Sequence, residues 1–145
     1  MQVIADNRYF GGESNGTNRR CALLSSLWEA ALIYAAADVF VAPSVQDNLP
    51  NTVMAALACG TPCVAFKIGG MPDLIEHKQN GYLAHPFAIE YLAQGMAWVL
   101  ESRQRWQVLS SRAREKVEQE FTLEKQARRY LSVFEEVCTT TFKQS

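Results

Sequence analysis

Residues 37–73 read ADVFVAPSVQDNLPNTVMAALACGTPCVAFKIGGMPD, and this stretch decides the fold of the chain. Two short apolar runs, Val39–Ala42 and Cys63–Phe66, are typical of parallel strands that are buried on both faces. Asn51–Ala58 is predicted to be a helix, because a proline suits its first turn and a glycine and a proline follow its end. A strand, a helix and a second strand in this order predict a right-handed unit with two parallel strands.

A loop, Ser44–Asn48, joins the first strand to the helix at the edge of the sheet where ligands of such folds bind. The backbone amides of Leu49, Asn51 and Thr52 can receive phosphate or sugar oxygens there, aided by the helix dipole. Asp47 is then either a ligand for a bound molecule or a loop carboxylate that stabilises the helix dipole. The asparagines of this segment either bind a ligand or only cap the helix and shape the turn.

A second loop, Lys67–Met71, follows the second strand and opens onto the same edge. Gly69 and Gly70 let the chain turn tightly there, or let a ligand approach the backbone. Lys67 can reach an anionic ligand, although a single lysine after a strand is more often only solvated. The two loops therefore predict one crevice at the carboxyl ends of the strands.

The rest of the chain alternates helices with short strands. The pattern of apolar residues predicts helices over residues 19–37, 72–77, 89–101, 105–120 and 123–137, and strands at residues 3–5, 9–10 and 82–84. This alternation predicts the α/β class, with a Rossmann-like parallel sheet that is flanked by helices and incomplete at its N-terminal side. We divide the chain into residues 1–18, which follow no clear pattern, a partial domain over residues 19–138, and a polar tail over residues 139–145.

The composition excludes several classes of protein. A chain of 145 residues with 48% hydrophobic and 20% charged residues suits one globular domain. Its net charge of -1 provides no positive field for nucleic acid. No apolar run approaches the roughly 20 residues of a membrane-spanning helix, and no basic start precedes an apolar signal segment. We therefore expect a cytoplasmic protein with at most peripheral contact with a membrane.

The residues that most often bind metals or perform catalysis form no recognisable group in the sequence. The four cysteines contain no Cys-x-x-Cys pair, so we expect reduced thiols and no metal site. His77 lies near a predicted helix end and His85 in a loop, and neither has a nucleophile near it in the sequence, so we assign no catalytic residue. The three tryptophans, Trp28, Trp98 and Trp106, are predicted to be anchors in the core or between domains.

Five segments of the sequence together resemble one enzyme family. Similarity to the C-terminal domain of the family 4 retaining glycosyltransferases, which have the GT-B fold, extends over residues 28–137 and rests on residues 37–44, 47–62, 69–73, 81–83 and 121–124. The resemblance implies that the predicted sheet is the C-terminal half of a GT-B architecture. The version Asp-Asn-Leu-Pro-Asn-Thr at residues 47–52 is similar to that of bacterial enzymes that build surface polysaccharides.

In this family, two acidic residues separated by seven others span the loop and the helix that follows it. The first binds hydroxyls of the donor sugar and the second binds the ribose of the nucleotide. The resemblance maps the first onto Asp47, in place of the commoner glutamate, and the second onto Ala55. A lost charged hydrogen bond is worth roughly 1.5 to 3 kcal/mol, which is about ten- to a hundredfold in donor affinity. Ala55 is therefore expected to weaken donor binding.

The resemblance implies a domain that binds the donor of a retaining hexosyltransferase. Such an enzyme moves a sugar from a nucleoside diphosphate sugar to a glycan or lipid-linked acceptor, with no cofactor and no metal. Family members bind the acceptor with an N-terminal domain, which we expect in cis or in trans, and without it the chain should be inactive. The candidate donor-binding residues are Asp47, Asn48, Leu49, Asn51, Thr52, Ala55, Lys67, Gly69 and Gly70.

Three other hypotheses compete with this one. A non-catalytic module for binding sugar nucleotides or for assembly would pair with an acceptor-binding partner chain, and an exposed apolar patch would favour it. A degenerate remnant would fold and bind nothing, which Ala55 and residues 1–18 favour. A different GT-B enzyme, such as a sugar-nucleotide epimerase, is opposed by the motif at residues 47–62.

Overall fold

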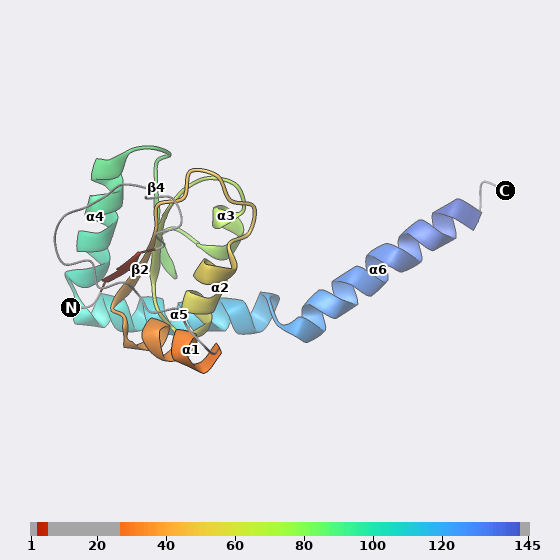
Figure 1. Cartoon of the computed structure of the whole chain (residues 1–145), viewed down its shortest axis with the longest axis horizontal. Coiled ribbons are helices and arrows are strands. Elements are labelled where there is room, and N and C mark those ends of the chain that lie inside the picture. The colour runs from red at the N-terminus through yellow and green to blue at the C-terminus, as the bar shows by residue number, and fades with distance from the viewer. Residues whose placement is uncertain (1–2, 6–26, 143–145) are drawn as a thin grey trace.

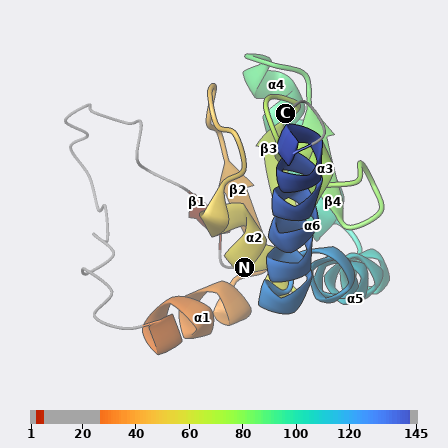
Figure 2. The same ribbon diagram turned by 90° about the vertical axis from the view of Figure 1, so that its right-hand side faces the viewer.

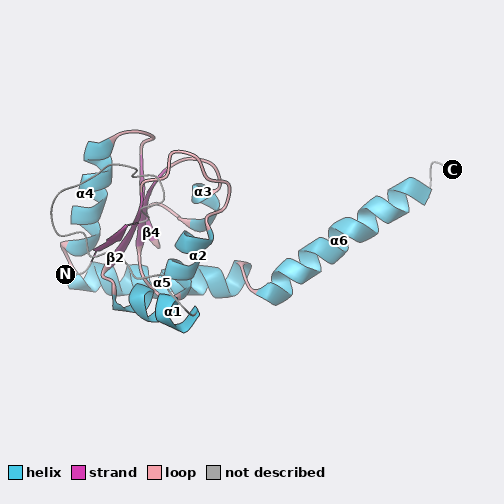
Figure 3. Cartoon of the chain, in the orientation of Figure 1, coloured by secondary structure: helices cyan, strands magenta, loops and turns pink. Residues whose placement is uncertain are grey.

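The computed structural model describes residues 3–5 and 27–142 of the chain, shown in Figure 1 by position and in Figure 3 by type of element. Short strands alternate with helices in its first part, and three long helices follow. In chain order the elements are β1 (Val3–Ala5), α1 (Leu27–Ala36), β2 (Val39–Ala42), α2 (Asn51–Ala58), β3 (Cys63–Phe66), α3 (Met71–Leu74), β4 (Gly81–Ala84), α4 (Ile89–Leu100), α5 (Arg103–Glu120) and α6 (Leu123–Phe142).

The four described strands form one parallel sheet in the order β1-β2-β3-β4. The register pairs Val3 with Val39, Phe40 with Cys63, and Cys63 with Gly81. Each connection that the structure describes contains a helix or a helical turn, as parallel pairing requires. The predicted α/β class with a parallel sheet is therefore confirmed.

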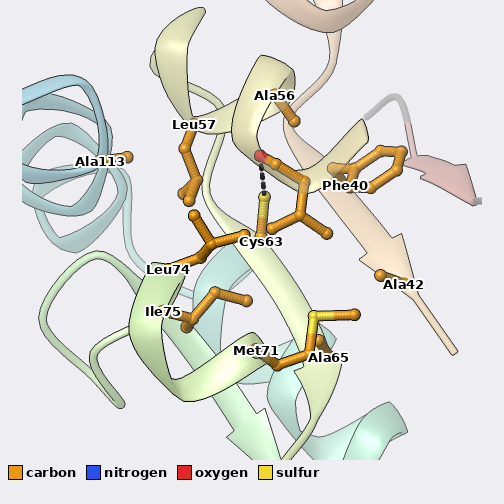
Figure 4. Packing of buried hydrophobic residues seen from close by; sticks show 11 residues of the cluster. Phe40, Ala42, Ala56, Leu57, Cys63, Ala65, Met71, Leu74, Ile75 and Ala113 are labelled. Carbon is orange, nitrogen blue, oxygen red and sulfur yellow. Dashed lines mark hydrogen bonds between the residues drawn. The ribbon is translucent and has the colours of Figure 1, made fainter. Parts of the chain in front are cut away.

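Helices cover both faces of the sheet, with α4 on one side and α2 and α3 on the other (Figure 1). Alternate residues of β3 enter two buried clusters: Cys63 and Ala65 belong to the first, and Val64 and Phe66 to the second. Figure 4 shows the first cluster, in which side chains of α2 and α3 close over β3. Burial on both faces explains why β2 and β3 are apolar at every position.

Helix α5 crosses the end of both layers (Figure 1). Its Ala113 packs in the first cluster and its Leu109 in the second, and both side chains are buried. Near its start, the indole Nε1 of Trp106 donates a hydrogen bond of 2.6 Å to the backbone carbonyl of Asp38. Helix α5 therefore links the two layers and fastens them to the start of β2.

Helix α6 extends away from the sheet (Figure 1), and in Figure 2 its far end points toward the viewer. The Oγ1 of Thr122 accepts a hydrogen bond of 3.3 Å from the Lys125 amide, so Thr122 caps this helix as predicted. Six large apolar side chains of α6 are each more than half exposed: Leu123, Tyr130, Leu131, Val133, Phe134 and Val137. Neither α6 nor any other helix within residues 27–142 is both long and apolar enough to cross a membrane.

Several predicted boundaries differ from the structure. Residues 19–26 of the predicted first helix, and the predicted strand at 9–10, lie outside the described residues. The side chain of Trp28 is 81% exposed, so the prediction that it anchors a core is wrong for the described part of the chain. The short helix predicted over residues 72–77 ends at Leu74, because Ile75 takes an extended backbone conformation.

The last two helices also begin or end elsewhere than predicted. Helix α5 starts at Arg103 rather than Arg105, because the Oγ of Ser102 accepts a hydrogen bond from the Arg105 amide and caps the helix two residues earlier. Helix α6 continues to Phe142 rather than ending at Val137, so most of the predicted polar tail is helical. The Oγ1 of Thr139 bonds to the carbonyl of Glu135, which satisfies this polar side chain within the helix.

Candidate functional site

The loops that follow β2 and β3 meet at the carboxyl edge of the sheet, as the sequence predicts for a crevice there. The backbone amide of Gly70 donates a hydrogen bond of 3.4 Å to the carbonyl of Asp47. Figure 1 shows both loops at the same end of the molecule as α3 and the start of α2. The structure therefore brings together Asp47 and the glycine pair from two segments of the chain.

Gly69 and Gly70 allow these two loops to touch. A β-carbon on Gly69 would lie 1.8 Å from the carbonyl oxygen of Asp47, and one on Gly70 would lie 1.6 Å from the carbonyl oxygen of Asn48. Gly69 also has a φ of 45°, in the region that favours glycine. Both glycines are thus needed for close backbone packing, and this contact fixes where the loop containing Asp47 lies.

The first turn of α2 points its backbone amides toward this loop. Pro50 is the N-cap residue and provides no side-chain cap, and its carbonyl accepts a hydrogen bond of 3.1 Å from the Met54 amide. Asn51 is exposed and Thr52 is half-buried. Asn51 therefore does not cap the helix, and the positive end of the α2 dipole faces the loop without a side-chain acceptor from the N-cap residue.

The two positions that the resemblance assigns to acidic residues lie on either side of this helix start. Asp47 is half-buried in the loop, and Ala55 is half-buried in the second turn of α2. The Ala55 carbonyl accepts a hydrogen bond of 3.1 Å from the amide of Cys59, so the backbone at this position is ordinary helix. A longer side chain at residue 55 would thus start from an unstrained backbone.

Leu49, which belongs to the loop before α2, also lines a cavity. This cavity has a volume of about 430 Å³ and lies between α3 and the junction of α5 with α6. Lys116 lies in this cavity and forms ion pairs of 2.7 Å with Glu76 and 2.8 Å with Glu120. Although burial lowers the pKa of Lys116, its hydrogen bonds to the two carboxylates raise the pKa above its usual value. The first ion pair joins α5 to the segment that follows α3, and the second lies within α5, so packing explains the charge of Lys116 in this cavity.

Lys67 lies in a different cavity, of about 280 Å³, which His77 and His85 also line. The Nδ1 of His77 accepts a hydrogen bond of 3.1 Å from the Leu83 amide. Partial burial and the neighbouring charge of Lys78 lower the pKa of His77. The sequence analysis considered the two histidines separately and did not bring them together; the one available signal was that they flank the same predicted strand.

The described residues include no cluster suited to a metal. No three or more His, Cys, Asp or Glu side chains within residues 27–142 are arranged to hold an ion. What the arrangement offers is a loop carboxylate, a glycine contact and a helix N-terminus at one edge of a parallel sheet. These groups can bind hydroxyls and phosphate oxygens.

Comparison with known families shows which family the chain belongs to. Residues 8–102, more than half of the chain, match the model of the family described as glycosyl transferases group 1. The chain belongs to the group 1 glycosyltransferases. Among the curated members, N-acetyl-alpha-D-glucosaminyl L-malate synthase of Bacillus anthracis is 27% identical over 118 residues, which are 81% of this chain and 31% of that enzyme.

Solved glycosyltransferase structures share the fold. The Anabaena protein HepE, solved in complex with UDP and glucose, is 26% identical and superposes with a TM-score of 0.69 over 74% of this chain and 30% of HepE. The C-terminal domain of the group 1 family protein LpcC from Francisella tularensis is 20% identical, with a TM-score of 0.63 over 70% of this chain and 52% of that domain. The sheet and its helices therefore have the fold of the C-terminal domain of GT-B glycosyltransferases. The chain spans less than a third of the length of the Bacillus enzyme and of HepE.

Proposed function

We propose that this chain is the donor-binding part of a family 4 retaining glycosyltransferase. In this proposal it binds a nucleoside diphosphate sugar, from which a hexosyl group passes to a glycan or lipid-linked acceptor. The observation that carries it is the contact of the Asp47 loop with Gly69 and Gly70 beside the N-terminus of α2. HepE supports it, because this relative was solved with UDP and with UDP-glucose.

The place of each candidate residue in the structure suggests its role in donor binding. Asp47 binds sugar hydroxyls, since a half-buried carboxylate forms strong hydrogen bonds to them. The amides of Leu49, Asn51 and Thr52 receive diphosphate oxygens at the positive end of the α2 dipole, beside Asn48. Ala55 lies where the family has a ribose-binding carboxylate, so donor affinity is reduced. Gly69 and Gly70 hold the Asp47 loop in place, and Lys67 belongs to a neighbouring cavity.

The acceptor side of the reaction is proposed to be supplied by another domain. The chain covers 31% of the Bacillus enzyme, so an acceptor-binding domain in the same polypeptide or in a partner chain would complete the catalytic cleft. Transfer requires donor and acceptor to be held together. We place the activity in the cytoplasm, at most peripherally at a membrane, in the synthesis of a surface polysaccharide, because the motif at residues 47–52 resembles such enzymes.

Calorimetric titration of the 145-residue chain with uridine, guanosine and adenosine diphosphate sugars tests the proposal. We expect one nucleotide sugar to bind, Asp47→Asn to weaken its binding about tenfold or more, and Ala55→Glu to tighten it by about tenfold. Ala58→Glu, which adds the same charge one turn further along α2, is the matched control and should not tighten binding. If no nucleotide sugar binds to the chain or to Ala55→Glu while both unfold cooperatively, the proposal is wrong for this chain, which is then a structural remnant or a half that depends on a partner.

A further inference from the structure

Both histidines of the chain lie in one cavity at the carboxyl end of β4. The cavity has a volume of about 280 Å³, and its lining side chains include Lys67, His77, Tyr82, His85 and Tyr91. Lys67 follows β3, the two histidines flank β4, and Tyr91 lies on α4. No carboxylate is among the residues that line it. A lysine and two imidazoles therefore converge on one hollow from three segments of the chain.

Backbone and ring contacts hold these groups in place. The amide of Lys67 donates a hydrogen bond of 2.8 Å to the carbonyl of Ala84, which fixes the start of the lysine loop against the end of β4. The ring of His77 meets the ring of Tyr82 edge to face, with centroids 4.6 Å apart. The ring of His85 meets that of Tyr91 in the same way at 5.1 Å. Each imidazole thus packs against an aromatic neighbour on one side, while both histidines remain exposed.

The hydrogen bond to His77 decides which of its nitrogens can bind a ligand. Its Nδ1 accepts the proton of the Leu83 amide, so the neutral ring carries its own proton on Nε2. Neutral His77 is therefore a donor at Nε2. The lowered pKa of His77, caused by burial and by positive neighbours that include Lys78 and Lys67, keeps the ring neutral at pH 7.

Charges close to the cavity favour an anion. Lys67 contributes a full positive charge to the lining, and Lys78 lies next to His77 in the chain. Two acidic residues are next to lining residues in the sequence without lining the cavity: Glu76, which Lys116 holds in an ion pair of 2.7 Å, and Glu90, beside Tyr91 on α4. An ammonium group together with imidazole donors suits phosphate, whose oxygens accept several charge-assisted hydrogen bonds at once.

We propose that the cavity formed by Lys67, His77 and His85 binds a phosphate group. The ammonium of Lys67 supplies the charge, and the imidazole of His77 donates one hydrogen bond from Nε2. The second imidazole, of His85, closes the other side of the hollow. This inference does not rest on the proposed nucleotide-sugar site, because its residues and its ligand can be tested with phosphate alone.

The NMR signals of the two histidine rings can report phosphate binding to the cavity. In a ring carbon–proton correlation spectrum of the 145-residue chain, inorganic phosphate added at about pH 7 and constant ionic strength should shift both histidine signals along one saturable curve. Lys67→Gln should weaken this phosphate binding by about tenfold or more, because a charged hydrogen bond is lost. Lys78→Gln is the matched control: it removes the same charge beside His77, but Lys78 does not line the cavity and lies 5.7 Å from the Trp98 ring. It should change the binding less than threefold.

Two results would overturn the inference. One is a shift that does not saturate, or that sodium chloride reproduces at equal ionic strength. The other is an equal loss of phosphate binding in Lys67→Gln and Lys78→Gln, which would show that positive charge attracts phosphate non-specifically and that the cavity does not bind it. Unchanged spectra elsewhere in the chain establish that each variant is folded. A further arm identifies the source of the phosphate: saturable binding of glycerol phosphate supports a free phosphate ester, and phosphate-reversible binding to phosphatidic acid vesicles supports a lipid headgroup.

Discussion

The α-carbon of Gly70 faces the carbonyl oxygen of Asn48 so closely that a β-carbon on residue 70 would lie 1.6 Å from that oxygen. The φ of Gly70 is -84°, which any L-residue adopts. This glycine is therefore required by the neighbouring loop and not by its own backbone conformation. Two segments that the sequence separates by a helix and a strand share a contact that leaves no room for a side chain.

Replacing Gly70 by alanine should force the two loops apart. We expect Gly70→Ala to lower the free energy of unfolding by more than about 2 kcal/mol, measured by urea denaturation. Gly60→Ala is the matched control, because a φ of 76° strains the backbone but the added β-carbon would be tight only against the flexible Oγ of Ser110, at 3.0 Å, and at an ordinary 3.6 Å from the Ser110 carbonyl oxygen. It should cost about 1 kcal/mol. Equal costs for the two variants would contradict the loop contact.

The described cysteines should react in a fixed order. Burial raises the pKa of the Cys63 thiol strongly, and its Sγ donates to the carbonyl of Val53 at 3.8 Å (Figure 4). Burial raises the pKa of Cys59 as well, against the opposing charge of Arg114, whereas Cys138 is exposed. With iodoacetamide at about pH 8, followed by peptide mass spectrometry, Cys138 should be labelled first, Cys59 later, and Cys63 only after unfolding. Rapid labelling of Cys63 in the folded chain would refute this order.

Replacing Trp106 by phenylalanine should weaken the link between α5 and β2. The aromatic ring remains, but the hydrogen bond of 2.6 Å from the indole to the Asp38 carbonyl is lost. We expect Trp106→Phe to destabilise the fold by about 1 kcal/mol, measured by thermal unfolding. Trp28→Phe makes the same change at a side chain that is 81% exposed, and should leave the melting temperature nearly unchanged. If both variants melt alike, this hydrogen bond contributes nothing.

Helix α6 should exchange its amide protons far faster than the sheet. Its residues from Leu123 to Thr139 are all exposed, and a single helix of 20 residues without packing is only marginally stable in water. Hydrogen exchange followed by mass spectrometry should give low protection in α6 and high protection in β3, whose side chains are buried at every position. Protection of α6 equal to that of β3 would show that α6 is packed against something in solution.

Most of the fold could be predicted from the sequence because local patterns determine it. Val39–Ala42 and Cys63–Phe66 are apolar at every position, and the structure buries all of these residues on a parallel sheet. Asn51–Ala58 is bounded by prolines and a glycine, and the helix has these limits. Boundaries that depend on a single side chain, such as the Ser102 cap of α5, were placed less well.

The candidate site could be predicted only in part, because its contacts join distant segments. The sequence placed Asp47 and Gly70 on loops at one edge of the sheet, and the structure confirms that they meet. It could not show that the glycines exist for loop packing, since the atoms they approach belong to another segment. For the same reason the sequence did not show that His77 and His85 line one cavity, since this depends on the course of the chain around β4. Ligand binding by these residues remains a prediction.

The order of the sheet has a consequence for how the protein forms. Each described strand after β1 pairs with the described strand before it, so no pairing among them has to wait for a distant C-terminal segment. The paired residues are nevertheless far apart in sequence, as Val3 and Val39 are, so each pairing must close a long loop and is expected to be slow. During synthesis, β2 and β3 can pair with the chain before them as soon as each leaves the ribosome. We therefore expect the sheet to assemble progressively from its N-terminal edge, with α5 closing the core only after β4 has emerged.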